Sequence, residues 1–226
     1  DYGYGDTRQK VGNAMPWLIG GFGSNLEFNN FFVDFVIDYS LGGDIVSIAG
    51  HYMKGAGMFE ETLEYRDEAN GGLAYTEDAE GNRTLANHSD AGVYHDGVIL
   101  DGVKTDGTPN DVIVSAGEYY MNTFQWGANP AWGSGMSRYD NAVHKNHYVK
   151  FRELSIGYNL PQSMASKLKC SNIRVALTGS NLFYLYRTFK QFDPETNIGS
   201  SWVSSAIVQG STSAVRSIGF SVRASF

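Results

Sequence analysis

Apolar and polar residues alternate along the last 14 residues of the chain, from Ser213 to Phe226. Six of the seven even positions are apolar, whereas the odd positions hold one clear hydrophobe, Val215. Successive side chains of a β-strand point to opposite faces, so this two-residue period predicts a strand with one apolar and one polar face. The same period predicts four further strands, and the five expected strands are residues 19–28, 31–41, 147–160, 172–184 and 213–226.

One expected strand breaks its own pattern. In residues 147–160 the apolar residues move from odd to even positions between Phe151 and Leu154. This change of phase predicts a β-bulge near Arg152 and Glu153.

The lengths of the expected strands and of their connections indicate a membrane barrel. Strands of 10 to 14 residues are long for a soluble sheet, where about 5–6 is usual, and suit a tilted transmembrane strand of about 9–11. Short connections, at Asn29-Asn30 and residues 161–171, alternate with long ones at residues 42–146 and 185–212. Outer-membrane barrels place short turns in the periplasm and long loops outside. Five strands cannot close such a barrel, because the known ones use an even number of at least 8, so we expect the C-terminal part of a longer protein.

The long connection differs in charge from the rest of the chain. Residues 43–146 hold 16 acidic and 6 basic side chains, a net charge of −10, against +3 for the remainder. A structureless loop of this length is uncommon, so we expect a folded extracellular excursion at about residues 43–146. Short β-segments are expected in it at residues 98–100 and 112–114.

Composition narrows the function further. The net charge of −7 argues against a nucleic-acid partner, and a single cysteine, Cys170, excludes an intramolecular disulfide framework. The five histidines show no metal spacing, and no catalytic triad is recognisable, so no enzyme activity, cofactor or metal is expected. Asp101, Asp106 and Asp111 do not match the spacing of a calcium loop and fit turn chemistry instead.

Several local patterns carry a family resemblance. They are Ile19-Gly20-Gly21-Phe22-Gly23, Asp38 to Asp44, Asp101-Gly102-Val103-Lys104, Tyr148 to Pro161, Asn172 to Phe183 and Phe192-Asp193-Pro194-Glu195. In this order they resemble the C-terminal portion of SusC-like (SusC/RagA family) TonB-dependent outer-membrane transporters.

The resemblance implies an all-β fold, namely the C-terminal strands of a 22-stranded transmembrane β-barrel whose N-terminal plug domain is absent from this chain. It implies TonB-dependent active import of a bulky nutrient, a glycan or an oligopeptide, across the outer membrane of a Gram-negative cell. The implied partners are a SusD-like surface lipoprotein, TonB through a segment not in this chain, the barrel assembly machinery, the substrate and the lipid bilayer. The alternatives are a passive porin or adhesin-type barrel without a plug and, from another class, a soluble β-sandwich lectin.

Two groups of residues are candidates for specific roles. The first group consists of five aromatic residues late in the long connection: Tyr119, Tyr120, Trp126, Trp132 and Tyr139. Aromatic rings offer large contact areas at low entropy cost, which suits contact with a substrate or with the lid protein. The alternative, which we favour, is that these rings pack the folded loop against the barrel or the lid. The terminal Phe226 follows an alternating strand and is expected to be the signal read by the barrel assembly machinery, the alternative being an ordinary terminal core residue.

Overall fold

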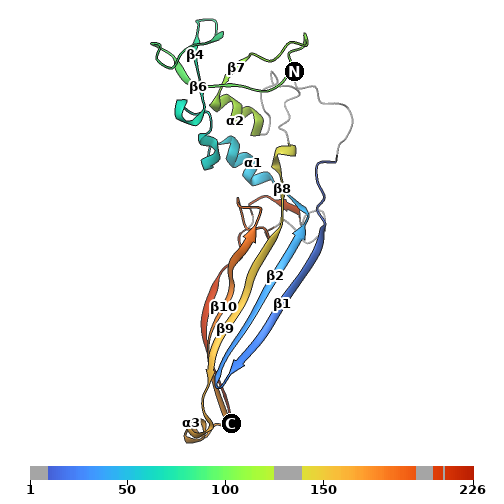
Figure 1. Ribbon diagram of the computed structural model, residues 1–226, viewed down its shortest axis with the longest axis vertical. Coiled ribbons are helices and arrows are strands. Elements are labelled where there is room, and N and C mark those ends of the chain that lie inside the picture. The colour runs from blue at the N-terminus through green and yellow to red at the C-terminus, as the bar shows by residue number, and fades with distance from the viewer. Residues whose placement is uncertain (1–9, 125–138, 197–205, 211) are drawn as a thin grey trace. The chain divides into compact units, whose positions relative to one another are not determined.

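The computed structural model describes residues 10–124, 139–196, 206–210 and 212–226. It is mainly β, and the chain divides into two compact units (Figure 1). The strand unit comprises Val11–Val46 and Val143–Phe226, and the loop unit comprises Ser47–Ala142. Among the described residues, no helix has both the length and the apolar character needed to cross a bilayer.

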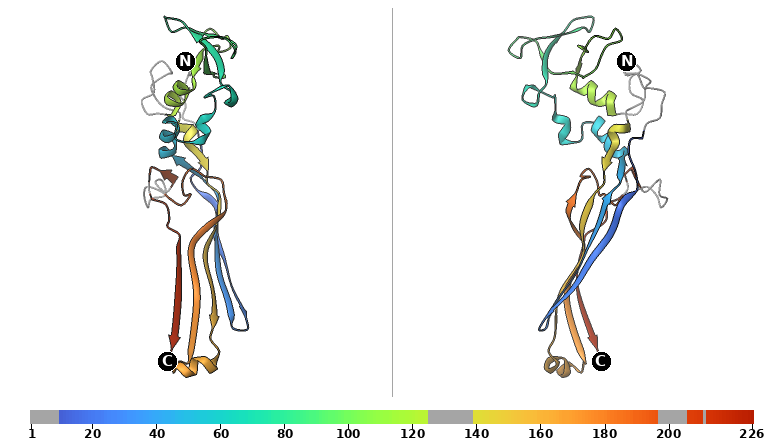
Figure 2. Two further views of the ribbon diagram at one scale, coloured as in Figure 1. Left: turned by 90° about the vertical axis from the view of Figure 1, so that its left-hand side faces the viewer. Right: turned by 45° about the vertical axis from the view of Figure 1, so that its right-hand side comes forward.

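A five-stranded antiparallel sheet forms most of the strand unit (Figures 1 and 2). Its strands lie in the order β1 (Pro16–Phe28), β2 (Phe31–Gly42), β9 (Tyr148–Asn159), β10 (Asn172–Arg187) and β12 (Ser217–Ser225). Each strand overlaps one of the five segments that show the two-residue period. The ends differ: β1 begins at Pro16 rather than Ile19, β10 runs on to Arg187, and β12 begins at Ser217 rather than Ser213.

Both short connections lie at one end of this sheet. Phe28 is opposite Phe31, so Asn29 and Asn30 form a two-residue hairpin turn, with Asn29 at a φ of 53°. Asparagine tolerates this left-handed conformation, which such turns require. The β9–β10 connection holds the short helix α3 (Gln162–Ala165) and the 3-10 turn η5 (Ser166–Leu168). The C-terminus lies at the same end, because Ser225 is opposite Asn172.

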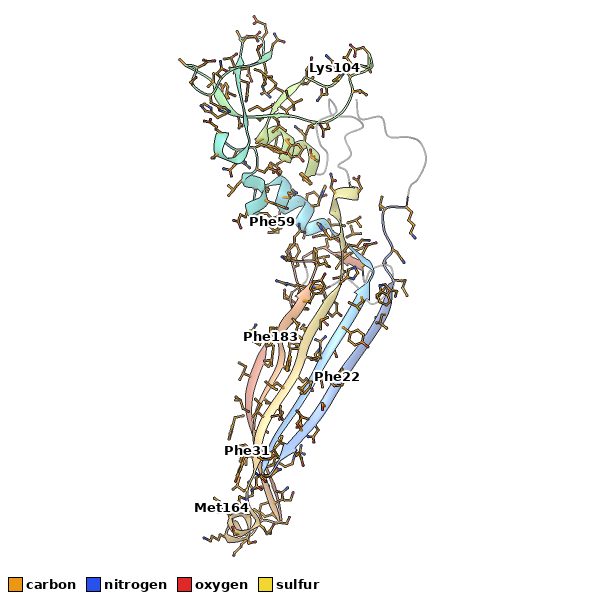
Figure 3. The ribbon with its side chains drawn as sticks, viewed as in Figure 1. Phe22, Phe31, Phe59, Lys104, Met164 and Phe183 are labelled. Atoms are coloured by element: carbon orange, nitrogen blue, oxygen red, sulfur yellow. The ribbon has the colours of Figure 1, made fainter. Side chains whose placement is uncertain are left out.

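The strand register collects the apolar residues on one side, which we call the apolar face. Leu177 of β10 lies between Ile156 of β9 and Phe220 of β12, and Val175 lies between Tyr158 and Val222. A row of aromatic rings crosses four strands on this face, with centroids 5.4 to 6.1 Å apart: Phe22, Phe35, Phe151 and Phe183. The two residues at its ends, Phe22 and Phe183, are labelled in Figure 3.

The other side, the polar face, carries the alternate residues, among them Asp34, Asp38, Arg174 and Arg223. The bulge expected from the sequence is confirmed and joins the two halves of β9. Val36 is opposite Glu153 and Ile37 is opposite Phe151, so Arg152 is the extra residue. The bulge keeps the residues on either side of it in phase with the apolar face of β2.

A small sheet adjoins the far end of the long strands. It has the order β11 (Ile207–Val208), β3 (Asp44–Ser47) and β8 (Val143–Lys145). Ile45, Phe189 and Val208 form its buried core, with Phe192 packed against them.

The loop unit has a fold of its own. A sheet of order β5 (Arg83–Leu85), β4 (Leu73–Glu77), β6 (Tyr94–Ile99) and β7 (Ile113–Ser115) accompanies the helices α1 (Ile48–Gly55) and α2 (Ala116–Phe124). Three 3-10 turns complete it: η1 (Glu60–Leu63), η2 (Glu68–Asn70) and η4 (Tyr139–Ala142). The two expected β-segments overlap β6 and β7, whereas neither helix was expected from the sequence.

Candidate functional site

In the described part of the chain, several charged side chains are partly or fully buried together on the polar face, beside the bulge. Glu195 accepts hydrogen bonds from Lys150 Nζ and from the Arg152 guanidinium. Arg152 also donates from Nε to Asp38 at 2.6 Å and from Nη1 to Asn181 Oδ1 at 2.6 Å. Lys150 is only 2% exposed, so its charge depends on these partners. We call this group the polar-face ion network.

The loop after β10 is held to the strands through this network. Burial raises the pKa of the Glu195 carboxyl, but the hydrogen bonds and charges of Arg152 and Lys150 together lower it by more. The pKa of Glu195 therefore lies below its usual value. The Tyr184 hydroxyl donates to Asp193, and Asn146 Nδ2 donates to the carbonyl of Pro194 at 3.1 Å. The Asp193-Pro194-Glu195 segment therefore lies against the strands, across their polar face.

A second polar cluster lies nearer the turn end of the sheet. Asp34 accepts hydrogen bonds from Asn25 Nδ2 and from Arg174 Nη2, the latter at 3.0 Å. The Arg174 guanidinium lies 3.4 Å from the ring centroid of Phe32. That ring is buried against Gly157, where a Cβ atom would overlap it. Asp34 and Arg174 are thus paired across the strands.

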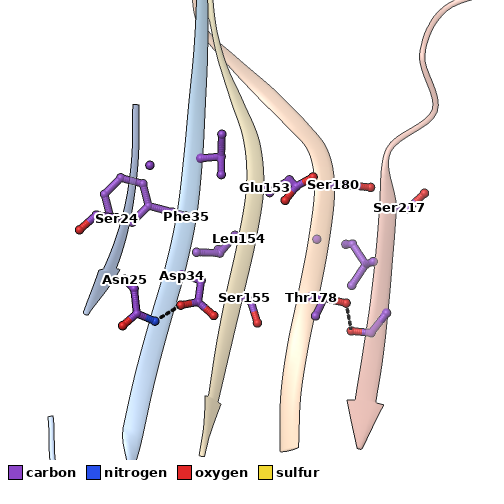
Figure 4. A pocket seen from close by; sticks show the side chains of 15 residues that line it. Ser24, Asn25, Asp34, Phe35, Glu153, Leu154, Ser155, Thr178, Ser180 and Ser217 are labelled. Atoms are coloured by element: carbon purple, nitrogen blue, oxygen red, sulfur yellow. Dashed lines mark hydrogen bonds between the residues drawn. The ribbon is translucent and has the colours of Figure 1, made fainter. Parts of the chain in front are cut away.

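A hollow of about 620 Å³ crosses all five strands near this cluster (Figure 4). Most of its lining residues belong to the polar face, and most of those have small side chains. They include Gly23, Asn25, Asp34, Ser155, Thr178, Ser180, Ser217 and Gly219. The small side chains leave room for a further protein element or a ligand against the sheet.

The aromatic residues singled out in the sequence lie in different settings. Tyr120, in α2, is 2% exposed and its hydroxyl donates to the Glu61 carbonyl at 3.0 Å, so it packs the loop unit. Tyr119 is half-buried, with its ring 6.0 Å from that of Tyr65. Tyr139 begins η4. Trp126 and Trp132 lie outside the described residues.

Phe226 and the acidic turn residues lie in exposed parts of the chain. Phe226 follows β12 directly and is 92% exposed. Asp106 accepts from the backbone N–H of Thr108 at 2.9 Å, and Asp111 accepts from Lys104 Nζ at 3.0 Å. The Asp106 contact is turn chemistry, and the Asp111 contact is an ion pair. No three His, Cys, Asp or Glu side chains of the described residues are grouped so as to hold a metal ion.

Sequence reasoning missed the polar-face ion network. Glu195 is 45 residues from Lys150 and 43 from Arg152, so no local spacing joins them. The sequence held two signals. The change in the apolar positions marks the bulge at Arg152, and the Asp-Pro-Glu of the last loop contains Glu195.

These features define a mainly β protein with a long-stranded sheet that separates apolar from polar side chains. No protein-family model matches the chain. Over 61 residues, 27% of its length, the chain is 38% identical to TonB-dependent receptor P3 of Formosa agariphila. The matched part is 6% of that receptor. The chain is thus similar, over about a quarter of its length, to a small part of a TonB-dependent receptor.

Proposed function

We propose that the five long strands are part of the wall of an outer-membrane β-barrel, with the apolar face toward lipid and the polar face toward the lumen. The observation that carries the proposal is the separation of apolar from polar side chains along most of the length of the strands. Large side chains such as Phe22, Phe31 and Phe220 are exposed on the apolar face, where they suit a hydrocarbon environment. The opposite face holds the charged residues, as in the lumen of such barrels.

The height of the apolar face supports the same proposal. Its residues on β2 run from Phe31 to Leu41, ten steps of about 3.4 Å, or about 34 Å along the strand. A tilt of about 40°, usual for such barrels, reduces this to about 26 Å, against an apolar band of about 25 Å. Phe31 and Tyr158 form an aromatic pair at the turn end, with centroids 4.8 Å apart. Tyr39 lies near the other end, as in the aromatic girdles at the two membrane interfaces.

The sheet needs further strands in this setting. In the described part of the chain β1 and β12 form its edges, and unpaired backbone groups at an edge are costly in lipid. We therefore propose that more strands complete a barrel, 22 in all as in the SusC-like transporters that the sequence resembles, a size that can hold a plug. The small side chains that line the hollow leave space for such a plug.

Active import of a bulky nutrient, a glycan or an oligopeptide, is the function we propose for the whole protein. It is supported by the similarity to a protein named as a TonB-dependent receptor and by the acidic loop unit, which has its own fold. In this proposal TonB supplies the energy, a SusD-like lipoprotein covers the outer opening, and the barrel assembly machinery reads Phe226. Tyr119, Trp126, Trp132 and Tyr139 remain candidates for substrate or lid contacts, whereas the buried Tyr120 packs the loop unit.

Energy dependence separates this proposal from a passive barrel. Uptake of labelled oligosaccharides and oligopeptides would be compared in cells with and without the full-length protein, and again after the inner-membrane proton gradient is dissipated. Active import predicts uptake that needs both the protein and the gradient. Uptake that persists without the gradient would favour a porin and contradict the proposal.

A further inference from the structure

The β9–β10 turn folds onto the apolar side of the sheet. Ala165, Cys170 and Ile173 form a buried cluster, with Leu160 and Val175 packed against it. Ile173 and Val175 are apolar-face residues, opposite Ala224 and Val222 of β12. The turn therefore does not simply continue the line of the strands. Its buried core packs against residues of the apolar face, so the turn lies toward that side of the sheet.

The outer surface of this turn combines apolar and basic side chains. Met164 is 52% exposed and Leu168 is 62% exposed. Met164 lies in α3 (Figure 3), and Leu168, four residues further on, is the last residue of η5. Lys167 and Lys169 flank Leu168 and are exposed. Residues 161–171 contain these two lysines and no acidic residue, so the turn is positively charged.

This combination suits one environment better than water. At a membrane interface, large apolar side chains enter the lipid while lysines extend their charged ends to the head groups. The aromatic pair of Phe31 and Tyr158 lies at the same end of the apolar face, close to the turn along β9. Aromatic and basic side chains occur together at the level of the head groups.

We infer that the α3–η5 turn is an interfacial anchor: Met164 and Leu168 enter the lipid of the adjacent phospholipid leaflet, and Lys167 and Lys169 bind its phosphate groups. The inference rests on the proposed function, since it takes the apolar face as the lipid-facing surface. It assigns the turn a partner, phospholipid, that a simple strand connection would not need. The anchor fixes the depth at which β9 and β10 lie in the bilayer.

Spin-label accessibility tests the anchor in the full-length protein. Met164→Cys and Leu168→Cys would be labelled with a nitroxide, in a background without other reactive cysteines, and placed in nanodiscs of phosphatidylethanolamine and phosphatidylglycerol. Oxygen concentrates in lipid, whereas a nickel chelate stays in water. We expect both labels to collide more with oxygen than with the chelate, and a control label at Asn29, in the polar hairpin turn, to show the reverse.

A label at Phe220, an apolar-face residue of β12 that is 70% exposed, distinguishes the two levels of the argument. If this label lies in lipid while those at Met164 and Leu168 lie in water, the anchor is refuted and the barrel proposal stands. If the Phe220 label also lies in water, the barrel proposal fails and the anchor with it.

The phosphate contacts have a separate readout. The double variant Lys167→Gln/Lys169→Gln should retain less phosphatidylglycerol than the wild type when bound lipid is counted by native mass spectrometry. Lys190→Gln, an exposed lysine in the loop after β10, is the matched control and should retain as much as the wild type. Equal retention by the double variant would overturn the assignment of the two lysines to lipid phosphate.

Discussion

Replacing Glu195 with glutamine keeps the shape of the side chain and removes the negative charge that Lys150 and Arg152 face. Loss of one partner of a fully buried ion pair costs about 3–5 kcal/mol, because the other charge stays buried without compensation. Here the Glu195 side chain is 21% exposed and Arg152 retains Asp38. We therefore expect a loss of about 2–3 kcal/mol, below the fully buried case.

Denaturant unfolding of the full-length protein in detergent micelles measures this loss. The midpoint should fall while the slope of free energy against denaturant stays the same. Limited proteolysis should also cut the Phe189–Thr196 segment faster, because the ion network holds this segment to the strands. Glu153→Gln is the matched control, since it removes an exposed carboxylate beside Arg152, and it should change little.

Two further results complete the test of this reasoning. If the cost comes from the uncompensated charge of Lys150, the double variant Lys150→Met/Glu195→Gln should be more stable than the sum of the two single variants predicts. The Glu195 pKa is lowered in the folded protein, so its contribution is complete above the ordinary pKa of about 4.3. That contribution disappears as the pH falls through the lowered pKa. A wild-type midpoint for Glu195→Gln at neutral pH would refute the reasoning.

Three other substitutions have expected outcomes. Gly157→Ala should lower the unfolding midpoint strongly, since a Cβ there would overlap the Phe32 ring. The control is Gly219→Ala, whose Cβ would lie 3.3 Å from a side-chain oxygen, and this variant should fold. Equal unfolding midpoints for the two variants would contradict the packing of Phe32 on Gly157. Arg83→Met should destabilise the loop unit by about 2 kcal/mol, because it leaves two carboxylates without their partner, measured as faster hydrogen exchange in β4 and β5; unchanged exchange would contradict this. Phe226→Asp should prevent insertion into the outer membrane, measured by fractionation, and normal yields of folded protein would refute its role as an assembly signal.

The sheet was predictable because its information is local. In a strand with one apolar face, apolar and polar residues alternate along the sequence. This alternation was sufficient to locate β2, β12 and the bulge at Arg152. The ends were less predictable: the alternation begins at Ser213, but β12 begins at Ser217, because pairing with β10 starts there. Residues 213–216 therefore precede the strand.

The loop unit and the ion network depend on distant residues. α1 has only eight residues, its first turn has no acidic side chain, and the side chain of its N-cap residue, Ser47, makes no capping hydrogen bond, so its start is weakly marked. Contacts with α2 and η4 stabilise it instead. Likewise, the pairing of Lys150 with Glu195 appears only when the loop after β10 returns to the polar face.

The mass and location of the native polypeptide test the central claim most directly. The measurement uses an antibody to residues 43–146 on denatured outer-membrane and soluble fractions. The 61 matched residues are 6% of the receptor in Formosa agariphila, which is therefore roughly 1000 residues long. The account predicts a band in the outer-membrane fraction several times heavier than 24.8 kDa. A band at 24.8 kDa, without a partner fragment, would contradict a barrel wall completed by further strands of the same chain.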